Sequence, residues 1–304
     1  MRILITGATG LVGTELVRRL DNDFTIVSRS AQRAIDHFDG KIGRQSIIEW
    51  SPRSGPMPQP ASEIDVVVNL MGESIGEGRW NVEKKKRIRD SRVLGTRNLV
   101  DSFSSWARPP KVLINSSAVG IYPDCGDEWI DETTRPGTGF LADVCTEWEQ
   151  EANKASGLGA RVVLLRTGIV LSEKGGALEK MLTPFRFGVG GKLATGKQWF
   201  PWIHLHDMVR LVEWAIDSES ISGAVNASSP YPVTNKEFTQ TLAKVLRRPA
   251  FFGVPEFALK IALGEFANAL LASQRVSPEV AKSAGFDFDF PDLESALVDL
   301  VGNR

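Results

Sequence analysis

The sequence comprises 304 residues, with 36 basic and 37 acidic side chains and a formal net charge of −1. This balance gives no reason to expect a nucleic acid or a membrane surface as partner, because both attract proteins with an excess of positive charge. The hydrophobic fraction of 42% is typical of a globular protein. The length is enough for about two domains or one elaborated α/β domain.

Three further features concern the compartment. The two cysteines, Cys125 and Cys145, have neither CxxC nor metal-binding spacing, which fits a reducing environment. No apolar run approaches the roughly 20 residues of a membrane-spanning helix. The first predicted strand begins at residue 2 and leaves no room for a signal peptide. We therefore expect a cytoplasmic protein without a membrane or nucleic-acid partner, and the oligomeric state has no signature in the sequence.

Residues 1–20 have the pattern of a strand, a glycine turn and a helix. An apolar run at 2–5 leads into GATGLVG at 7–13, and apolar residues at helical spacing follow. The glycines let the backbone bend sharply and approach a ligand, while the helix N-terminus offers unpaired N–H groups to a pyrophosphate. The pattern predicts a dinucleotide site rather than a purely structural turn. The residues expected to contact the dinucleotide are Gly7, Thr9, Gly10, Leu11 and Val12.

The second predicted strand, 24–27, ends at Ser28 and Arg29. An NAD-specific fold places an acidic residue here, on the ribose 2′-hydroxyl. In this chain Arg29 stands between two serines and Arg33 follows. A guanidinium forms forked, charge-assisted hydrogen bonds to a 2′-phosphate. The sequence therefore favours NADP(H) over NAD(H), with a solvated surface arginine as the alternative interpretation.

The third and fourth strands are expected at 47–50 and 65–70. Between them, 51–60 holds four prolines, which argues for a crossover without a full helix. The fourth strand is an unbroken apolar run, typical of a buried parallel strand. Three residues at its end are expected near the ribose side of the cofactor: Leu70, Met71 and Gly72.

A helix over 80–103 carries a run of basic side chains from Lys84 to Arg92. Its acidic neighbours and the neutral whole favour a solvated helix face over a nucleic-acid patch. The fifth strand, 111–115, ends in Ser116 and Ser117. Ligands bind at the carboxyl ends of parallel strands, so these two hydroxyls are well placed for chemistry.

The remaining pattern predicts a loop or lid, two extended segments, two helices before the tail, and three helices in the tail. Asp207 is expected to N-cap the helix that follows it. The expected ranges are a loop at 124–139, a helix at 140–155, a strand at 161–169, a glycine-rich region at 175–196, an extended segment at 199–206, and helices at 208–217, 235–246, 255–271 and from 291.

Together the elements predict a doubly wound parallel sheet of the Rossmann type with a smaller C-terminal substrate-type lobe. The dinucleotide domain is expected to comprise 1–170 and 202–229. The smaller lobe is expected to comprise 171–201 and 230–304.

The segments GATGLVG at 7–13, VVVNLMG at 66–72 and SSAVGIY at 116–122 resemble an extended short-chain dehydrogenase/reductase of the NAD(P)-dependent epimerase/dehydratase type. Two later segments, GKQWFPWIH at 196–204 and QRVSP at 274–278, are similar to an atypical epimerase family subgroup whose bacterial members include YfcH. By position, the resemblance implies cofactor contacts for Ser28, Arg29, Leu70, Met71, Arg87, Arg92 and Val170, with Ser116 also assigned to this site.

Typical members use a serine and a Tyr-x-x-x-Lys pair, in which the lysine lowers the pKa of the tyrosine that acts as base. Neither tyrosine of this chain has that spacing, since Gly126 follows Tyr122 by four residues and Asn235 follows Tyr231. The resemblance instead places Leu141 at the tyrosine and Cys145 at the lysine. This substitution is what the atypical subgroup shows.

Several candidates for chemistry remain. Arg92 offers a fixed positive charge to a cofactor phosphate or a substrate anion. Ser117 is a candidate donor to a carbonyl. Cys145 is a nucleophile or redox-sensitive thiol if a cation makes it a thiolate, and otherwise a buried, inert side chain. The aromatic segment 198–202 is a pocket floor or packing between lobes. We expect no metal, because the histidines around residue 205 offer only two ligands.

Two functions fit these patterns. One is an NADP(H)-dependent oxidoreductase or epimerase-like enzyme acting on a small carbonyl-bearing or nucleotide-linked substrate. The other is a non-catalytic NADP(H)-binding protein that reports redox state. The lost tyrosine and lysine favour the second, and the retained Ser117 with the glycine-rich region favours the first.

Overall fold

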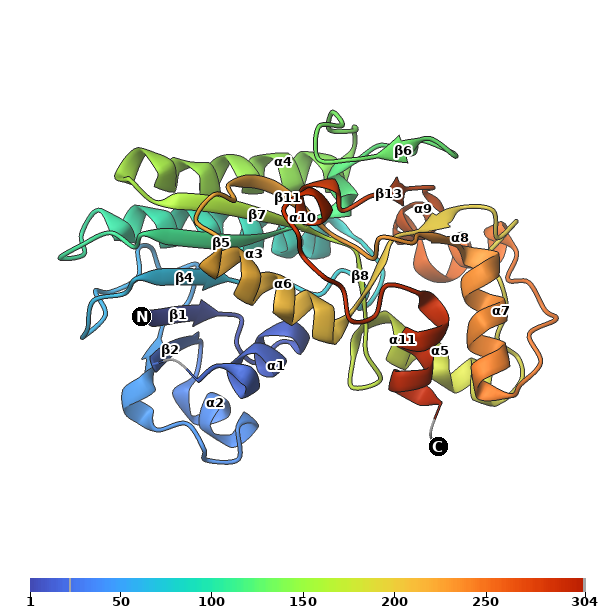
Figure 1. Cartoon of the computed structure of the whole chain (residues 1–304), viewed down its shortest axis with the longest axis horizontal. Helices are drawn as coiled ribbons and strands as arrows, with labels where there is room; N and C mark the ends of the chain where they lie inside the picture. Colours follow the sequence, from blue (N-terminus) through green and yellow to red (C-terminus); the bar gives the residue numbers. More distant parts are fainter. Residues whose placement is uncertain (22, 303–304) are drawn as a thin grey trace.

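The computed structural model describes residues 1–21 and 23–302 (Figure 1). Within them, a seven-stranded sheet has the order β11-β7-β5-β4-β1-β2-β3, and its neighbouring strands are parallel. The predicted doubly wound α/β fold is confirmed. The strands are β1 (Arg2–Thr6), β2 (Asp23–Ser28), β3 (Ile47–Glu49), β4 (Val66–Asn69), β5 (Val112–Ala118), β7 (Arg161–Thr167) and β11 (Gly223–Ala227).

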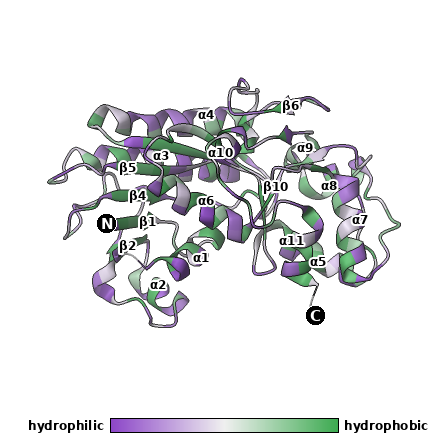
Figure 2. Cartoon of the chain, viewed as in Figure 1, coloured by the Kyte–Doolittle hydropathy of each residue, from purple (hydrophilic) through white to green (hydrophobic). Residues whose placement is uncertain are grey.

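Helices cover both faces of this sheet, so its strands are apolar on both sides, and they are coloured hydrophobic in Figure 2. Along β1, Ile3 and Ile5 face one helical layer while Leu4 faces the other, because side chains alternate along a strand. The first layer holds α1 (Leu11–Arg19), α2 (Ala31–His37) and α6 (Leu205–Asp217). The second holds α3 (Val82–Phe103) and α4 (Phe140–Asn153).

A smaller lobe lies at the other end of the long axis from α2 (Figure 1). Its core is formed by apolar side chains of α5, α7 and α11 around Phe200 and Trp202. The elements outside the central sheet are β6 (Trp129–Ile130), β8 (Ile169–Leu171), α5 (Gly176–Arg186), β9 (Trp199–Phe200), β10 (Trp202–His204), β12 (Val233–Thr234), α7 (Asn235–Leu246), α8 (Glu256–Leu263), α9 (Phe266–Leu271), β13 (Arg275–Val276), α10 (Glu279–Ser283) and α11 (Leu293–Val301).

Short connections complete the chain. Three 3-10 turns occupy Arg44–Ser46, Val119–Ile121 and Lys154–Leu158. Across the described residues, no helix combines the length and the apolar character needed to cross a bilayer. Strand β11 returns to the edge of the central sheet and α6 packs against α1. The division into two domains at the predicted boundaries stays a prediction.

Most expected elements are present, with differences at their ends, but the region at 175–196 that the glycines predicted to be rich in loops contains helix α5. The crossover from β3 to β4 contains no helix, as its prolines predicted. The basic helix begins at Val82, because the side chain of Asn81 accepts a hydrogen bond from the Lys84 N–H and caps it. The single helix expected at 255–271 is two helices, since Gly264 adopts φ +62° and ends the first.

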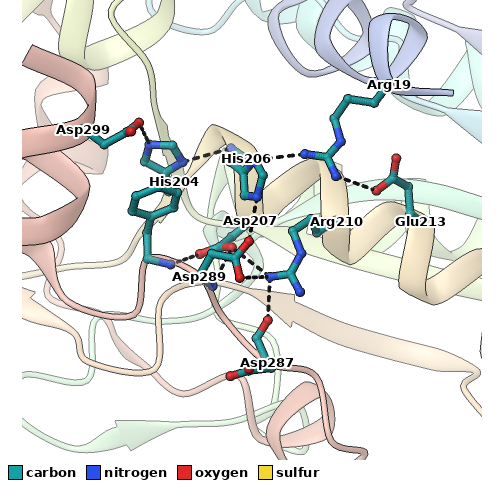
Figure 3. A network of polar contacts seen from close by, with 10 residues as sticks. Arg19, His204, His206, Asp207, Arg210, Glu213, Asp287, Asp289 and Asp299 are labelled. Carbon is teal, nitrogen blue, oxygen red and sulfur yellow. Dashed lines mark hydrogen bonds and ion pairs between the residues drawn. The ribbon is translucent and has the colours of Figure 1, made fainter.

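The prediction that Asp207 caps a helix from residue 208 is wrong. Helix α6 begins at Leu205, because the ring Nδ1 of His204 accepts the His206 N–H at 3.0 Å and serves as the cap. Asp207 is fully buried, and its carboxylate instead accepts the N–H groups of Asp289 and Phe290 at 3.0 and 2.9 Å (Figure 3). This carboxylate therefore ties the C-terminal segment to the sheet domain.

The site-forming feature of the fold is the position of β1 between β2 and β4. After β1 the chain forms β2, which pairs with one side of β1. Later in the chain β4 pairs with the other side of β1. Such a reversal of strand order opens a crevice beyond the carboxyl ends of the strands, where doubly wound folds bind ligands. The glycine turn and the ends of β2 and β4 all reach this crevice.

Candidate cofactor site

A cavity of about 950 Å³ occupies the crevice at the carboxyl ends of β1, β2 and β4. It extends from the glycine turn at one side to the loop after β4 at the other. Nine of the residues predicted to contact a cofactor line it: Gly7, Thr9, Gly10, Ser28, Arg29, Leu70, Met71, Gly72 and Arg87.

The glycine turn is built for close approach of backbone to backbone. Gly7 has φ +68°, and a Cβ there would lie 2.6 Å from the carbonyl oxygen of Leu70. A Cβ on Gly13 would lie 2.4 Å from the Gly7 oxygen, so the helix packs tightly on the turn. Gly10 caps α1 without a side-chain hydrogen bond. The N–H groups of the first turn, which includes Leu11 and Val12, remain suited to an anion.

The end of β2 carries positive charge without an internal counterion. Arg29 and Arg33 are exposed, and within the described residues neither forms an ion pair with a carboxylate. The acid beside them, Glu49, accepts the Ala31 N–H at 3.1 Å and lies 3.5 Å from Arg44. The Glu49 carboxylate is thus bound to the start of α2 rather than to Arg29 or Arg33. This end of the cavity is electropositive and suits a phosphate.

A further wall of the cavity was missed from the sequence. Trp50, Ser51, Pro52 and Arg53 line it directly after β3. The indole N–H of Trp50 donates to the Gly55 carbonyl at 3.0 Å and shapes this turn. The sequence did contain a signal for this wall: residues that follow a third parallel strand lie at the same edge of the sheet as the glycine turn.

The opposite end of the cavity is formed by Glu73 and Arg87 with Ser91. Glu73 lies 3.0 Å from Lys84 and 3.3 Å from the Arg87 Nε. The hydrogen bond from Lys84 lowers the pKa of Glu73 below its usual value. Arg87 therefore already has a carboxylate partner, unlike Arg29 at the other end.

Arg92 lies beneath Gly72, where a Cβ on the glycine would come within 3.1 Å of the guanidinium. Its Nη1 donates to the carbonyls of Glu73 and Ile88 at 3.0 and 3.3 Å, and the guanidinium lies 5.3 Å from the Trp148 ring centre. Burial lowers the pKa of Arg92 below its usual value. In the described chain this cation has carbonyl partners but no carboxylate.

Buried amides and hydroxyls hold the strand ends that carry this site. Asn69 accepts from the Thr6 hydroxyl at 2.6 Å and donates to Asn115 at 2.6 Å and to Thr96 at 2.9 Å. The indole N–H of Trp148 donates to the same threonine at 2.8 Å. These contacts join β1, β4 and β5 to helices α3 and α4. They fix the relative positions of the loops that line the cavity.

A second buried polar network, which we call the Glu149 network, lies at the ends of β5 and β7. The Ser117 hydroxyl donates to Glu149 at 2.6 Å, and Arg166 donates two hydrogen bonds of 2.9 Å to the same carboxylate. Arg166 also donates to the Tyr122 hydroxyl at 3.0 Å, which in turn donates to Asn226 at 2.7 Å. Ser117 thus has an internal acceptor, and its side chain is nearly inaccessible.

Charges in the Glu149 network stabilise one another. Burial opposes the charge on Arg166, but its hydrogen bonds to Glu149 raise its pKa above the ordinary value. Burial raises the pKa of Tyr122 to about 12. Ser116, the neighbour of Ser117, is half-buried, and its carbonyl accepts from the Asn115 amide at 2.7 Å.

Comparison with known proteins now assigns the family. The model of the NAD dependent epimerase/dehydratase family matches residues 3–228, and a domain of unknown function matches 254–300. An epimerase family protein of Staphylococcus haemolyticus is 40% identical over 305 residues, covering 99% of each chain. One from Mycobacterium leprae is 38% identical over 302 residues, covering 97% of this chain and 94% of that protein. The chain belongs to the NAD-dependent epimerase/dehydratase family.

Solved structures agree with this assignment. The crystal structure of the human epimerase family protein SDR39U1, determined with NADPH, has a TM-score of 0.87 and 32% identity, and the match covers 100% of both chains. A UDP-glucuronic acid 4-epimerase from Bacillus cereus has a TM-score of 0.76 at 14% identity over 99% of this chain and 98% of that one, and shares the fold.

Two α4 residues singled out from the sequence, Leu141 and Cys145, provide no acid or base that is charged near neutral pH. Leu141 packs against Gly120. Cys145 is buried among Val119, Ile121 and Tyr122. Burial raises the pKa of the Cys145 thiol to about 12, so the thiol is protonated at neutral pH.

Three predicted positions lie away from the cavity wall described above. Val170 pairs with Ile203 between β8 and β10 and packs on the main core. Gln198 is buried and donates to the Leu193 carbonyl at 3.2 Å, which holds the glycine-rich loop. The side chain of Leu11 lies beside Gly175 and Gly176, where an added Cβ would come within 3.4 Å of it.

The histidine segment brings three potential metal-ligand atoms within 4.8 Å of one another, from His206, Asp207 and Asp289. Arginines already contact this group, as Figure 3 shows. Arg210 lies 3.0 Å from the Asp289 carboxylate, and Arg19 is 2.9 Å from the His206 Nδ1. These contacts provide the carboxylates with cationic partners and join α1 and α6 to the C-terminal segment.

Proposed function

We propose that this protein binds NADP(H) in the cavity and is an epimerase-like oxidoreductase of the atypical short-chain dehydrogenase/reductase type. Its substrate would be a small carbonyl-bearing or nucleotide-sugar-like molecule. The observation that carries the choice of NADP(H) is the pair Arg29 and Arg33 at the end of β2, exposed to the cavity and without carboxylate partners in the described structure. The NADPH bound to the human relative supports the same choice.

The residues of the cavity fit this cofactor in three places. The uncapped first turn of α1, after Gly7 and Gly10, would receive the pyrophosphate. Arg29, with Arg33 beside it, would hold the 2′-phosphate by charge-assisted hydrogen bonds. The residues after β4 would contact the ribose on the nicotinamide side. When bound, the cofactor supplies hydride transfer, and the protein supplies position and electrostatics.

The proton chemistry of typical members has no matching group here. Tyr122 and Cys145 are protonated at neutral pH and buried, and the Ser117 hydroxyl donates to Glu149. Arg92 is the fixed cation beneath Gly72. We propose that it stabilises negative charge on a substrate oxygen electrostatically, without transferring a proton. A substrate that brings its own acid or base, or an anionic group, fits such a site.

Isothermal titration calorimetry of NADPH, NADP⁺, NADH and NAD⁺ tests the cofactor assignment. We expect NADP(H) to bind best, and Arg29→Ala to weaken it by about 10- to 100-fold, because a hydrogen bond to a charged group contributes about 1.5–3 kcal/mol. NADH affinity should change little. Arg18→Ala, an exposed arginine on α1, is the control. If no dinucleotide binds, the proposed function is wrong.

A second candidate is a non-catalytic NADP(H)-binding sensor or regulatory protein. The observation that favours it is the internal use of Ser117, Tyr122 and Cys145 in buried packing and hydrogen bonding. Single-turnover oxidation of bound NADPH, followed by its absorbance with a panel of carbonyl compounds, separates the two functions. Turnover that falls in Arg92→Gln supports the enzyme. A partner interaction that depends on NADPH without turnover supports the sensor.

A further inference from the structure

The smaller lobe exposes a group of large apolar side chains far from the cofactor cavity. Phe251 is 88% exposed and Phe187 is 80% exposed. The full group, which we call the exposed apolar face, comprises Phe187, Val189, Phe251, Phe252, Phe257 and Ile261. Exposed apolar residues are unremarkable singly, but a cluster of this size marks an interaction surface.

The chain segments that carry these side chains lie side by side. The Ala194 N–H donates to the Val254 carbonyl, and the Val254 N–H donates to the Lys192 carbonyl, both at 2.8 Å. Arg248 donates to the Arg186 carbonyl at 3.0 Å. Helix α8 begins two residues after Val254 and presents Phe257 and Ile261, one turn apart, to solvent. The segments that carry the six apolar residues are therefore adjacent in the lobe.

This region is strongly basic although the whole chain is neutral. The ranges 180–200 and 244–261 contain a single acidic residue, Glu256, which is paired with Lys260. Their eight basic residues are Lys180, Arg186, Lys192, Lys197, Lys244, Arg247, Arg248 and Lys260.

Two of these cations pair with a carboxylate, Lys244 with Glu294 and Lys260 with Glu256. Arg186, Arg247 and Arg248 are exposed, and among the described residues none of them forms an ion pair. Arg247 and Arg248 precede Phe251 by only a few positions, and Arg186 directly precedes Phe187. Positive charge and exposed aromatic rings are thus interleaved along the same two segments.

We propose that the exposed apolar face docks on an anionic membrane surface. Phe251 and Phe252 would enter the headgroup region while Arg247 and Arg248 pair with lipid phosphates, the combination that peripheral proteins use at interfaces. Phe251 and Phe187 protrude almost fully into solvent, and a fluid interface accepts such protrusions without a matching pocket. A second copy of the chain fits less well, because a symmetric contact would bring the same arginines together.

Membrane docking is compatible with an open cofactor site. In Figure 1, α5, α7 and α8 lie at one end of the long axis, while α2 and the end of β2 lie near the other. The orientation would leave the cavity accessible to a soluble dinucleotide. This inference stands apart from the proposed function, since it uses no residue of the cavity.

Sedimentation of the full-length protein with vesicles tests the inference. The vesicles are phosphatidylcholine alone, or an equal mixture of phosphatidylcholine and phosphatidylglycerol. We expect binding to the mixed vesicles only, and weaker binding as salt rises. The double variants Phe251→Ser/Phe252→Ser and Arg247→Glu/Arg248→Glu should each lose about 10-fold or more in affinity. Val82→Ser and Arg18→Glu, exposed elsewhere, should bind like the wild type.

Three outcomes would overturn the inference. One is the absence of binding to either vesicle. Another is equal binding with and without phosphatidylglycerol. The third is a dimer, seen by light scattering, that Phe251→Ser/Phe252→Ser dissociates, since this would assign the face to a second copy. Circular dichroism and urea unfolding of every variant confirm folding. A wild type that binds vesicles but no dinucleotide would refute only the proposed function.

Discussion

The cofactor cavity and the Glu149 network lie along the same edge of the sheet, yet they use their charged side chains in opposite ways. At the end of β2, Arg29 and Arg33 face a cavity and have no internal counterion within the described chain. At the end of β7, Arg166 is buried and makes a forked pair with Glu149. The first arrangement leaves charge available to a ligand, whereas the second uses charge to hold β5, β7 and α4 together.

This difference separates a crevice that is open to a ligand from a neighbouring wall that is filled by packed and hydrogen-bonded side chains. Helix α4 carries Leu141 and Cys145, and Glu149 follows Cys145 by one turn. Glu149 faces inward to Arg166 and Ser117. This part of α4 belongs to the packed interior, and the Arg92 guanidinium lies beside Gly72 of the cavity.

The largest effect should come from breaking the Glu149 network. Glu149→Ala leaves the Arg166 cation buried without its partner, so we expect the free energy of unfolding to fall by about 3–5 kcal/mol. Glu147→Ala, on the same helix, removes an exposed pair with Arg89 and should cost less than about 1 kcal/mol. Urea unfolding measures both. NADPH affinity of folded Glu149→Ala should stay within about threefold of wild type. If Glu149→Ala and Glu147→Ala lower the free energy of unfolding equally, the contrast between the buried network and an exposed ion pair is wrong.

Alkaline pH should weaken the buried network next. Burial holds the folded pKa of Cys145 and of Tyr122 at about 12, above the ordinary values of 9.0 and 10.0. The unfolded chain therefore loses these protons first, and unfolding becomes easier as pH rises from 9 toward 12. Each group contributes a slope of about 1.4 kcal/mol per pH unit.

Urea unfolding at a series of pH values measures this slope. Cys145→Ala should remove the part of the decline that begins near pH 9, and the tyrosine should account for the part that begins near pH 10. Cys125→Ala, at a half-buried cysteine, should keep most of the decline. A wild-type stability that is flat from pH 8 to 11 would refute the buried, protonated state of both groups.

The smallest effect on stability should come from the cavity. Arg33→Ala removes an exposed cation without an internal partner, so the free energy of unfolding should change by less than about 0.5 kcal/mol. NADPH affinity should nevertheless fall about 3- to 10-fold, because one of the two arginines proposed to hold the 2′-phosphate is lost. Calorimetry and urea unfolding of the same preparation measure both. A stability loss as large as that of Glu149→Ala would show that the cavity arginine is structural.

Sequence patterns were sufficient wherever neighbours along the chain decide the structure. The strand, glycine turn and helix at 2–19 follow from local spacing, as does the position of Arg29 at the end of a strand. Parallel strand ends share one edge, so these local predictions already placed nine residues around one cavity. The family resemblance was likewise carried by short contiguous segments and is confirmed by the family match.

Only the tertiary structure decides which polar groups have hydrogen-bond partners within the protein and which remain available to a ligand. Asp207 has the spacing of a helix cap but binds backbone N–H groups some 80 residues away, because His204 already caps α6. Ser117 stands at a strand end that suits chemistry, yet its acceptor on α4 is 32 residues distant. The net charge near zero likewise gives no indication of the basic face, because the segments that form it, 180–200 and 244–261, are far apart in the sequence. Packing of elements that are distant in the sequence decides which side chains become partners. A local sequence pattern therefore cannot predict these pairs.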